Sequence, residues 1–112
     1  MAARARPTSS RSVKARIPTA FSLMGHRIRV RRIPPSKWKM ADAVGYFDPA
    51  RMSIGVCTGA SASTQEQAFW HEAMHAMLYC LGSPDYGNEQ FVDQMGGLIH
   101  QLVTSAEHRI CR

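Results

Sequence analysis

The sequence is poor in cysteine and has no long apolar segment. Its 3 cysteines show no C-x-x-C spacing, which argues against a disulfide framework and favours a reducing, cytoplasmic compartment. No apolar run approaches the roughly 18 residues of a transmembrane helix, and no apolar stretch of a secretory signal follows the basic N-terminus. We therefore expect the 112 residues to form one small domain that does not engage a membrane.

Acidic residues are absent from positions 1–41, which hold 11 of the 14 lysine and arginine residues. Positions 42–112 hold the other 3 basic residues and all 8 acidic residues, a net charge of −5. Residues 1–20 combine Arg, Ser, Ala and Pro without apolar periodicity, which predicts a disordered basic tail before a single domain at 21–112. Organellar transit peptides have a similar composition, but a solvated tail is the simpler interpretation.

Alternating polarity and turn residues predict three strands. In "GHRIRVRRI", the residues His26, Ile28 and Val30 alternate with arginines, so one face packs and the other is basic. "AVGYFDPARMSIGV" predicts a hairpin with arms at 43–47 and 52–56, joined by an Asp-Pro turn. The sheet is expected to be three-stranded and largely antiparallel.

The basic strand face has two interpretations, a solvated edge or a surface for an anionic partner such as nucleic acid. No aromatic side chain alternates with Arg27, Arg29 and Arg31 to stack on bases. The nucleic-acid interpretation is therefore the weaker one.

Two helices follow the hairpin. Ser63 and Glu66 predict a capping box for the first helix, and Gly82 marks its end. Asn88 is the predicted N-cap of a second helix that reaches Ser105. That helix carries an apolar stripe made of Phe91, Val92, Met95, Leu98, Ile99, Leu102 and Val103. The predicted fold class is α+β, a small sheet packed on an antiparallel helix pair.

Adjacent glycines at 96 and 97 interrupt the second helix. Each glycine costs a helix about 1 kcal/mol relative to alanine. Close packing of the second helix against the first is the expected compensation.

The segment "HEAMH" places His71 and His75 on one face of the first helix, with Glu72 one step round. Two imidazoles in this pattern can bind one metal ion while the glutamate reaches a water molecule. Zinc suits the pattern, because catalytic zinc takes three protein ligands and leaves the fourth position to water. A longer motif with a third histidine is excluded, since Leu78 and Leu81 occupy its glycine and histidine positions.

A carboxylate from the second helix is the alternative third ligand. Glu89 stands at the start of that helix, and the short turn at 82–87 can fold it back toward the histidines. Asp93 is one helical turn further and can accept the second ring N–H of a histidine ligand. One zinc ion per chain is the predicted cofactor.

The combination "HEAMH…NEQFVD" resembles the gluzincin-type zinc metallopeptidases, whose layout is thermolysin-like. The small size is most similar to minimal bacterial and phage zincins of the ImmA/IrrE-like kind, over residues 40–105. This resemblance implies a zinc metallopeptidase with His71, His75 and Glu89 as metal ligands. It implies Glu72 as the general base and Asp93 as the residue behind a histidine ligand.

The resemblance also implies that a peptide substrate adds in extended form to an edge strand, which would be residues 52–59. Thermolysin-like enzymes carry a second domain with a histidine and a tyrosine that stabilise the oxyanion, and this chain has no room for it. Tyr46, Tyr86 and His100 are the remaining candidates for that role.

Two other interpretations compete with the peptidase. An ordinary polar network between the histidines and a carboxylate would explain His71 and His75 but not the placement of Glu72. A zinc-stabilised module that binds partners without cleaving them would use the same ligands and would not need a base. The presence of Glu72 therefore favours catalysis.

Overall fold

The computed structural model describes residues 14–109. Most of the tail predicted for residues 1–20 lies outside that range. Inside it, Ala15 and Ile17 are buried in the core and the first strand begins at Ala20. The side chain of Arg32 donates to the carbonyl oxygens of Ala15 and Ile17, each at 3.1 Å. Residues 14–20 thus belong to the folded domain, which begins earlier than predicted.

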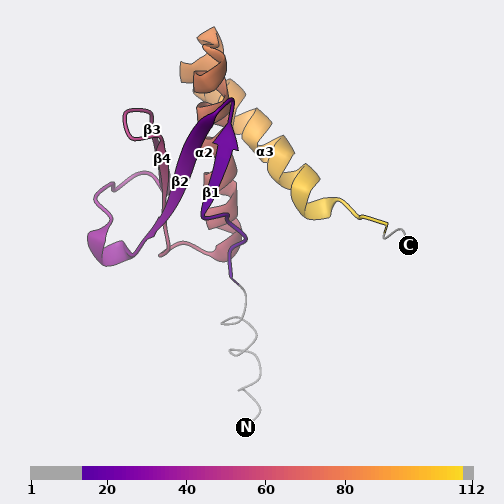
Figure 1. The fold of residues 1–112 in the computed structure, drawn as a ribbon. Coiled ribbons are helices and arrows are strands. Elements are labelled where there is room, and N and C mark those ends of the chain that lie inside the picture. Colours follow the sequence, from indigo (N-terminus) through magenta and orange to yellow (C-terminus); the bar gives the residue numbers. More distant parts are fainter. Residues whose placement is uncertain (1–13, 110–112) are drawn as a thin grey trace.

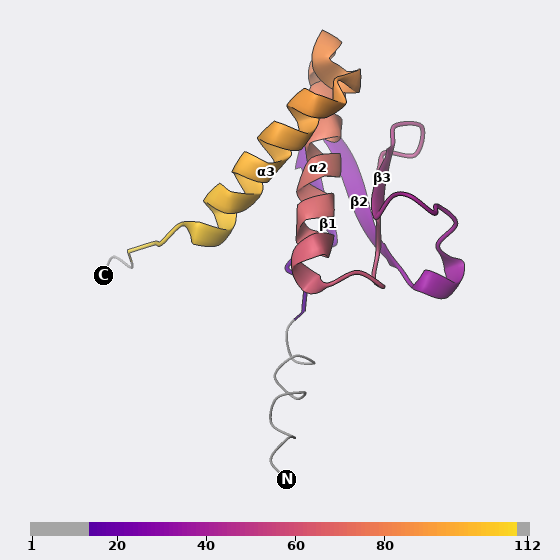
Figure 2. The same cartoon turned by 180° about the vertical axis from the view of Figure 1, so that it is seen from behind.

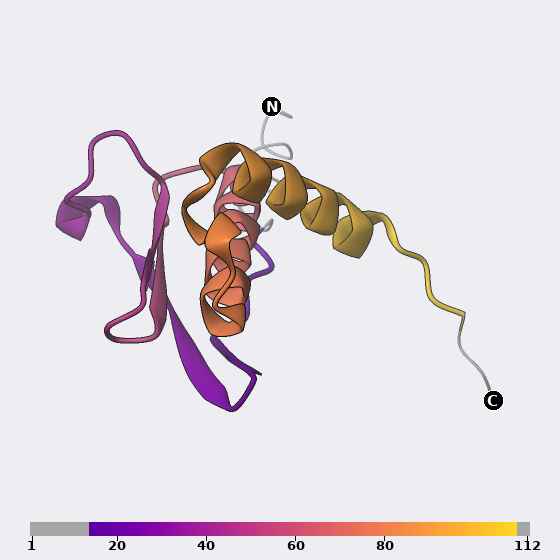
Figure 3. The same cartoon turned by 90° about the horizontal axis from the view of Figure 1, so that it is seen from above.

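The chain forms an α+β fold in which one long helix covers one face of a four-stranded sheet and a second helix packs on the first (Figures 1 and 3). The elements in chain order are β1 Ala20–Leu23, β2 His26–Ile33, the 3-10 helix η2 Pro35–Lys37, β3 Gly45–Asp48, β4 Ser53–Cys57, α2 Ala62–Leu81, the 3-10 helix η3 Pro84–Gly87 and α3 Glu89–Ser105. The strand order is β1-β2-β4-β3. The α+β class predicted from the sequence is confirmed.

The prediction of a three-stranded, largely antiparallel sheet is wrong. The sheet is mixed, because β2 and β4 pair in parallel while the other two pairs are antiparallel. The missed strand is β1, which forms a hairpin with β2. Met24 and Gly25 between them have φ values of 49° and 85°, as in tight hairpin turns that usually contain Asn-Gly. Methionine at the first turn position concealed this hairpin.

The strand at 52–59 is not the edge strand that the resemblance implied. β4 lies inside the sheet, hydrogen-bonded to β2 on one side and β3 on the other. Ile54 and Val56 on it are fully buried against α2 and the sheet core. The edge on this side of the sheet is β3, which contacts α2.

Capping explains the bounds of both helices. The side chain of Ser61 accepts from the Thr64 amide at 3.2 Å, so Ser61 is the N-cap of α2 and the predicted Ser63 box is wrong. Gly82 ends α2 in the left-handed conformation, with φ 65°. The Asn88 side chain caps α3 by accepting from the Phe91 amide at 3.1 Å, as predicted.

The two helices meet at Gly96, as the sequence predicts. A Cβ atom on Gly96 would lie 3.0 Å from the Cα of His71, so glycine permits the close approach. From there α3 runs back in the opposite general direction but diverges from α2 (Figures 1 and 2). The distal part of the predicted apolar stripe is therefore exposed, which corrects the prediction for Leu98, Leu102 and Val103.

Candidate metal centre

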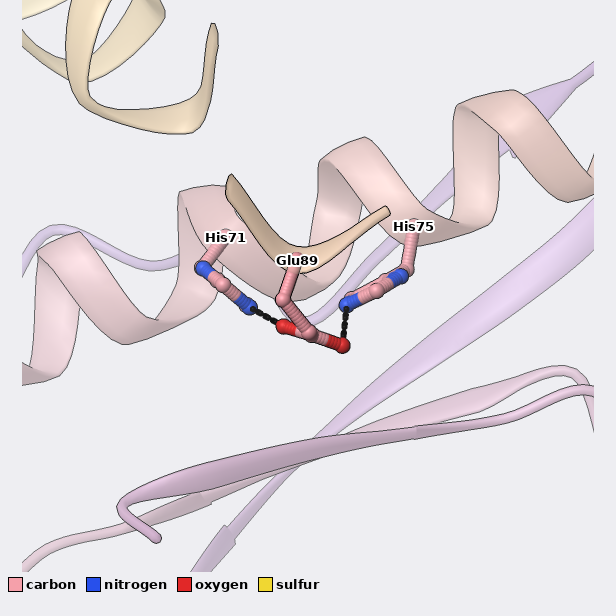
Figure 4. Close-up of side chains that lie close together, drawn as sticks. All are labelled: His71, His75 and Glu89. Carbon is pink, nitrogen blue, oxygen red and sulfur yellow. Dashed lines mark hydrogen bonds and ion pairs between the residues drawn. The ribbon is translucent and has the colours of Figure 1, made fainter. Parts of the chain in front are cut away.

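The ligand candidates come from two elements that the η3 turn brings together. His71 and His75 are one turn apart in the middle of α2, while Glu89 is the first residue of α3. Because Asn88 caps α3, the first turn of this helix is fixed directly beside α2. Figure 4 shows the Glu89 carboxylate reaching between the two imidazoles.

The three side chains converge on one point. Nε2 of His71 lies 3.1 Å from Oε1 of Glu89, and Nε2 of His75 lies 3.1 Å from Oε2 of the same carboxylate. One ligand atom from each residue can be chosen so that all lie within 4.8 Å of one another. Two ligands on a tetrahedral zinc ion, each about 2.0–2.2 Å from it, are about 3.4 Å apart. The spacing therefore fits a zinc ion with small adjustments.

The hydrogen-bond partner of one ring nitrogen of His75 decides which nitrogen carries the hydrogen. The other nitrogen then has a lone pair and lies next to the Glu89 carboxylate. Nδ1 lies 2.9 Å from the carbonyl oxygen of Tyr86, which can only accept. A neutral ring then carries its hydrogen on Nδ1 and turns the lone pair of Nε2 toward Glu89. Two atoms that only accept are unfavourable neighbours at 3.1 Å unless a proton or a metal ion lies between them. A bound metal ion would satisfy this nitrogen and the carboxylate together.

His71 is also surrounded by acceptors. Its Nδ1 lies 3.4 Å from Oδ1 of Asp93, on the side opposite Glu89. A neutral imidazole has one N–H, so it cannot satisfy both carboxylates. With the hydrogen on Nδ1, Asp93 orients the ring and leaves Nε2 free to bind a cation. The structure thus brings Asp93 to the position predicted for it.

Glu72 lies beside these ligands without joining them. It lines a cavity of about 430 Å³ together with His71, His75 and Glu89. Burial is the largest cause of the raised pKa of its carboxyl; the neighbouring imidazoles of His71 and His75 lower the pKa and the Glu89 carboxylate raises it, with a net upward shift. A carboxylate with a raised pKa is suited to accept a proton and return it.

Gly45 at the start of β3 makes room for Glu72. A Cβ atom there would lie 3.2 Å from Cγ of Glu72 and 3.5 Å from Cβ of Ala68 on α2. The absence of a side chain lets the edge strand approach the helix at the Glu72 carboxylate. We did not identify Gly45 from the sequence, although a glycine inside a strand is a known sign of close approach.

The three candidates for oxyanion stabilisation differ in where their side chains lie relative to Glu72. Tyr86 lines the same cavity as Glu72, and its ring centre is 5.6 Å from that of His75. Tyr46 also borders this cavity, but its ring packs over Gly55 on the sheet face opposite α2. His100 lies 3.3 Å from Glu66, whose other oxygen accepts from the Arg16 amide at 2.7 Å. His100 therefore ties α3 to α2 and lies outside the candidate site.

Comparisons with models of protein families, with curated proteins and with solved structures found no match to this chain. Among residues 14–109, no helix is long and apolar enough to cross a membrane.

Proposed function

We propose that this protein is a zinc-dependent peptidase in which His71, His75 and Glu89 hold the metal. The observation that carries the proposal is the pair of histidine nitrogens that face one carboxylate while a separate carboxylate, Glu72, borders the same cavity. A structural zinc site requires the ligands alone, whereas a hydrolytic site also requires a base. Glu72 supplies that second requirement.

Zinc bound at these ligands would lower the pKa of a water molecule toward 7 and polarise the scissile carbonyl. Glu72 borders the same cavity and would accept the proton of the attacking water as general base. The same carboxyl then donates that proton to the leaving amine. Tyr86 borders the cavity and supplies a hydroxyl donor for the developing oxyanion.

The substrate would be a peptide or protein bound in extended form along β3. This strand pairs only with β4 within the described residues, so its outer backbone groups are available. Gly45 and Phe47 on β3 line the cavity of Glu72, which brings an added strand close to the base. We place the enzyme in the cytoplasm, in keeping with the free thiols of Cys57 and Cys80.

The test compares Glu72→Gln with the wild type for metal content and for cleavage of an unfolded protein substrate. The wild type and Glu72→Gln should each bind one zinc per chain by native mass spectrometry, because Glu72 is not a ligand. Turnover by Glu72→Gln should fall at least about 10²-fold, as expected for loss of a general base. His71→Ala serves as the control that loses the metal.

Each outcome distinguishes the candidate functions. A zinc-loaded wild type that does not cleave peptides, with equal stability in Glu72→Gln, would support a zinc-stabilised binding module instead. Full activity of Glu72→Gln would contradict the mechanism. If the wild type binds no zinc even after zinc is supplied, His71, His75 and Glu89 form an ordinary polar network and not a metal site.

A further inference from the structure

Within residues 14–109, no helix covers the sheet face opposite α2 (Figures 1 and 3). Gly45 and Phe47 face α2, so Tyr46 between them faces the other way and its ring occupies the space above Gly55. Arg31 is the β2 partner of Gly55 in the parallel register, which places it on the same face as Tyr46. The aromatic residue and the cation thus share the open side of the sheet.

A cavity of about 570 Å³ lies beside this face. Its lining includes three exposed cations, Arg31, Lys37 and Lys39, together with Trp38, Met40 and Tyr46. The loop that carries the lysines is held in place. The Trp38 ring stacks on Tyr46 with ring centres 5.8 Å apart, and its Nε1 donates to the Ala43 carbonyl at 2.9 Å.

The three cations have no acidic partner. Within residues 14–109, neither Arg31 nor Lys37 nor Lys39 forms an ion pair, and no acidic residue lines the cavity. The neighbouring Arg32 is different, because its guanidinium is used to hold the backbone of residues 15 and 17. The cavity therefore has unneutralised positive charge that an anionic group can complement.

This cavity borders the candidate active site at the free edge of β3. Met40 and Tyr46 line both the basic cavity and the cavity of Glu72. An extended peptide added to β3 turns alternate side chains to opposite faces of the sheet. One set of side chains would face the metal ligands, and the other set would face the basic cavity.

We propose that the basic cavity selects substrates with acidic side chains, bound as an extended polypeptide along β3. The proposal rests on the proposed peptidase function and adds a substrate class to it. The acids of the metal site itself, Glu72, Glu89 and Asp93, would repel acidic side chains on the other face. Acidic residues are therefore expected at alternate substrate positions.

A polypeptide explains the surroundings of the cavity better than a nucleic acid does. The rings of Trp38 and Tyr46 stack on each other, which uses one face of each ring and reduces their value as platforms for bases. The free strand edge beside the cavity offers backbone hydrogen bonds, which a peptide can form along its whole length.

The test measures fluorescence anisotropy of labelled probes with the zinc-supplied full chain carrying Glu72→Gln, so that binding is observed without cleavage. The probes are an alternating ten-residue Glu-Thr peptide, the isosteric Gln-Thr peptide and a ten-nucleotide oligothymidylate. The Glu-Thr peptide should bind about tenfold tighter than the Gln-Thr peptide at 50 mM salt. That difference is the size expected if peptide glutamates form three exposed ion pairs with Arg31, Lys37 and Lys39. The difference should shrink at 500 mM salt.

Two triple variants with the same change of net charge locate the interaction. Arg31→Gln, Lys37→Gln and Lys39→Gln together should abolish the preference for the Glu-Thr peptide. The matched control combines Lys14→Gln, Arg27→Gln and Arg109→Gln, which are exposed residues outside the cavity, and should retain it. Circular dichroism melting establishes that both variants fold.

Three results would overturn the proposal. They are equal affinity for the Glu-Thr and Gln-Thr peptides, an equal loss of preference in both triple variants, or tighter binding of the oligothymidylate that displaces the peptide. The measurement is independent of turnover. A chain that binds the acidic peptide but never cleaves would contradict the peptidase alone, while cleavage without acidic preference would contradict the basic cavity alone.

Discussion

Tyr86 contributes to the site through both its backbone and its side chain. Its carbonyl oxygen accepts from Nδ1 of His75 and so orients the imidazole proposed as a zinc ligand. Burial raises the pKa of its phenol, and the negative charges of Tyr79, Glu72 and Glu89 raise it further. The phenol therefore keeps its proton at neutral pH and can donate to an oxyanion.

Tyr86→Phe should lower kcat about 10²-fold, which is the typical effect of removing one oxyanion donor. Zinc content should be unchanged, because the carbonyl that orients His75 is part of the backbone. Steady-state kinetics with a peptide substrate provide the measurement. Tyr79→Phe is the matched control, since the Tyr79 ring packs against Tyr86 with ring centres 5.5 Å apart but does not line the cavity of Glu72. Equal losses of kcat in both variants would contradict the role of Tyr86.

Asp93 is expected to act on the metal through His71. Asp93→Asn removes the charge that holds the Nδ1 hydrogen of His71, so the Kd for zinc should rise about tenfold. Competition with a chromophoric chelator measures this change. Asp85→Asn in η3 lowers the acidic charge equally without contacting either histidine, and an identical rise there would mean that Asp93 acts only through general charge.

The crossing of α2 and α3 depends on one of two adjacent glycines. Gly96 faces the backbone of His71, whereas a Cβ atom on Gly97 would meet nothing within 4 Å. Gly96→Ala should therefore lower the free energy of unfolding by about 1–3 kcal/mol, because the helices must separate. Gly97→Ala should raise it by about 0.5–1 kcal/mol through its better helix propensity.

Urea denaturation of both variants measures this contrast. Gly96→Ala should also weaken zinc binding, since the contact lies at the backbone of a ligand. Destabilisation of the same size in both variants would contradict the proposal that only Gly96 is needed for the close approach of α2 and α3.

At the scale of the whole molecule, the metal would link the two parts of the core. One cluster lies between the sheet and α2, and the other joins α2 to η3 and α3 around Val92. His71 and His75 belong to α2, while Glu89 begins α3, so a bound ion bridges the helices at their junction. Binding to the folded state alone stabilises it in proportion to the logarithm of free zinc.

Free zinc at 100 times its Kd should stabilise the fold by about 2.7 kcal/mol. For a domain of this size, that corresponds to an increase in Tm of about 10–20 °C. Thermal melting followed by circular dichroism, with zinc and then with EDTA, measures the shift and its reversal. His71→Ala should show no shift, and a shift of equal size in that variant would place the zinc elsewhere.

Local patterns in the sequence determined much of the site. The four-residue spacing of His71 and His75 follows from helical periodicity, and Asn88 with Gly82 set the bounds of the turn that returns Glu89. The hairpin of β3 and β4 was also predicted, because the alternation of polar and apolar residues and the Asp-Pro turn are local signals in the sequence. These features depend on residues only a few positions apart.

Only the tertiary structure decided how the sheet is ordered and where its free edge lies. The parallel pairing of β2 with β4 joins segments separated by the η2 loop and β3, so no local pattern encodes it. That pairing buries β4, makes β3 the edge beside Glu72 and places Arg31 on the face of Tyr46. The divergence of α3 from α2 is likewise a tertiary feature, and it leaves Leu102 exposed. Apolar periodicity predicts that a helix has a packing face, but it does not show where the neighbouring helix ends.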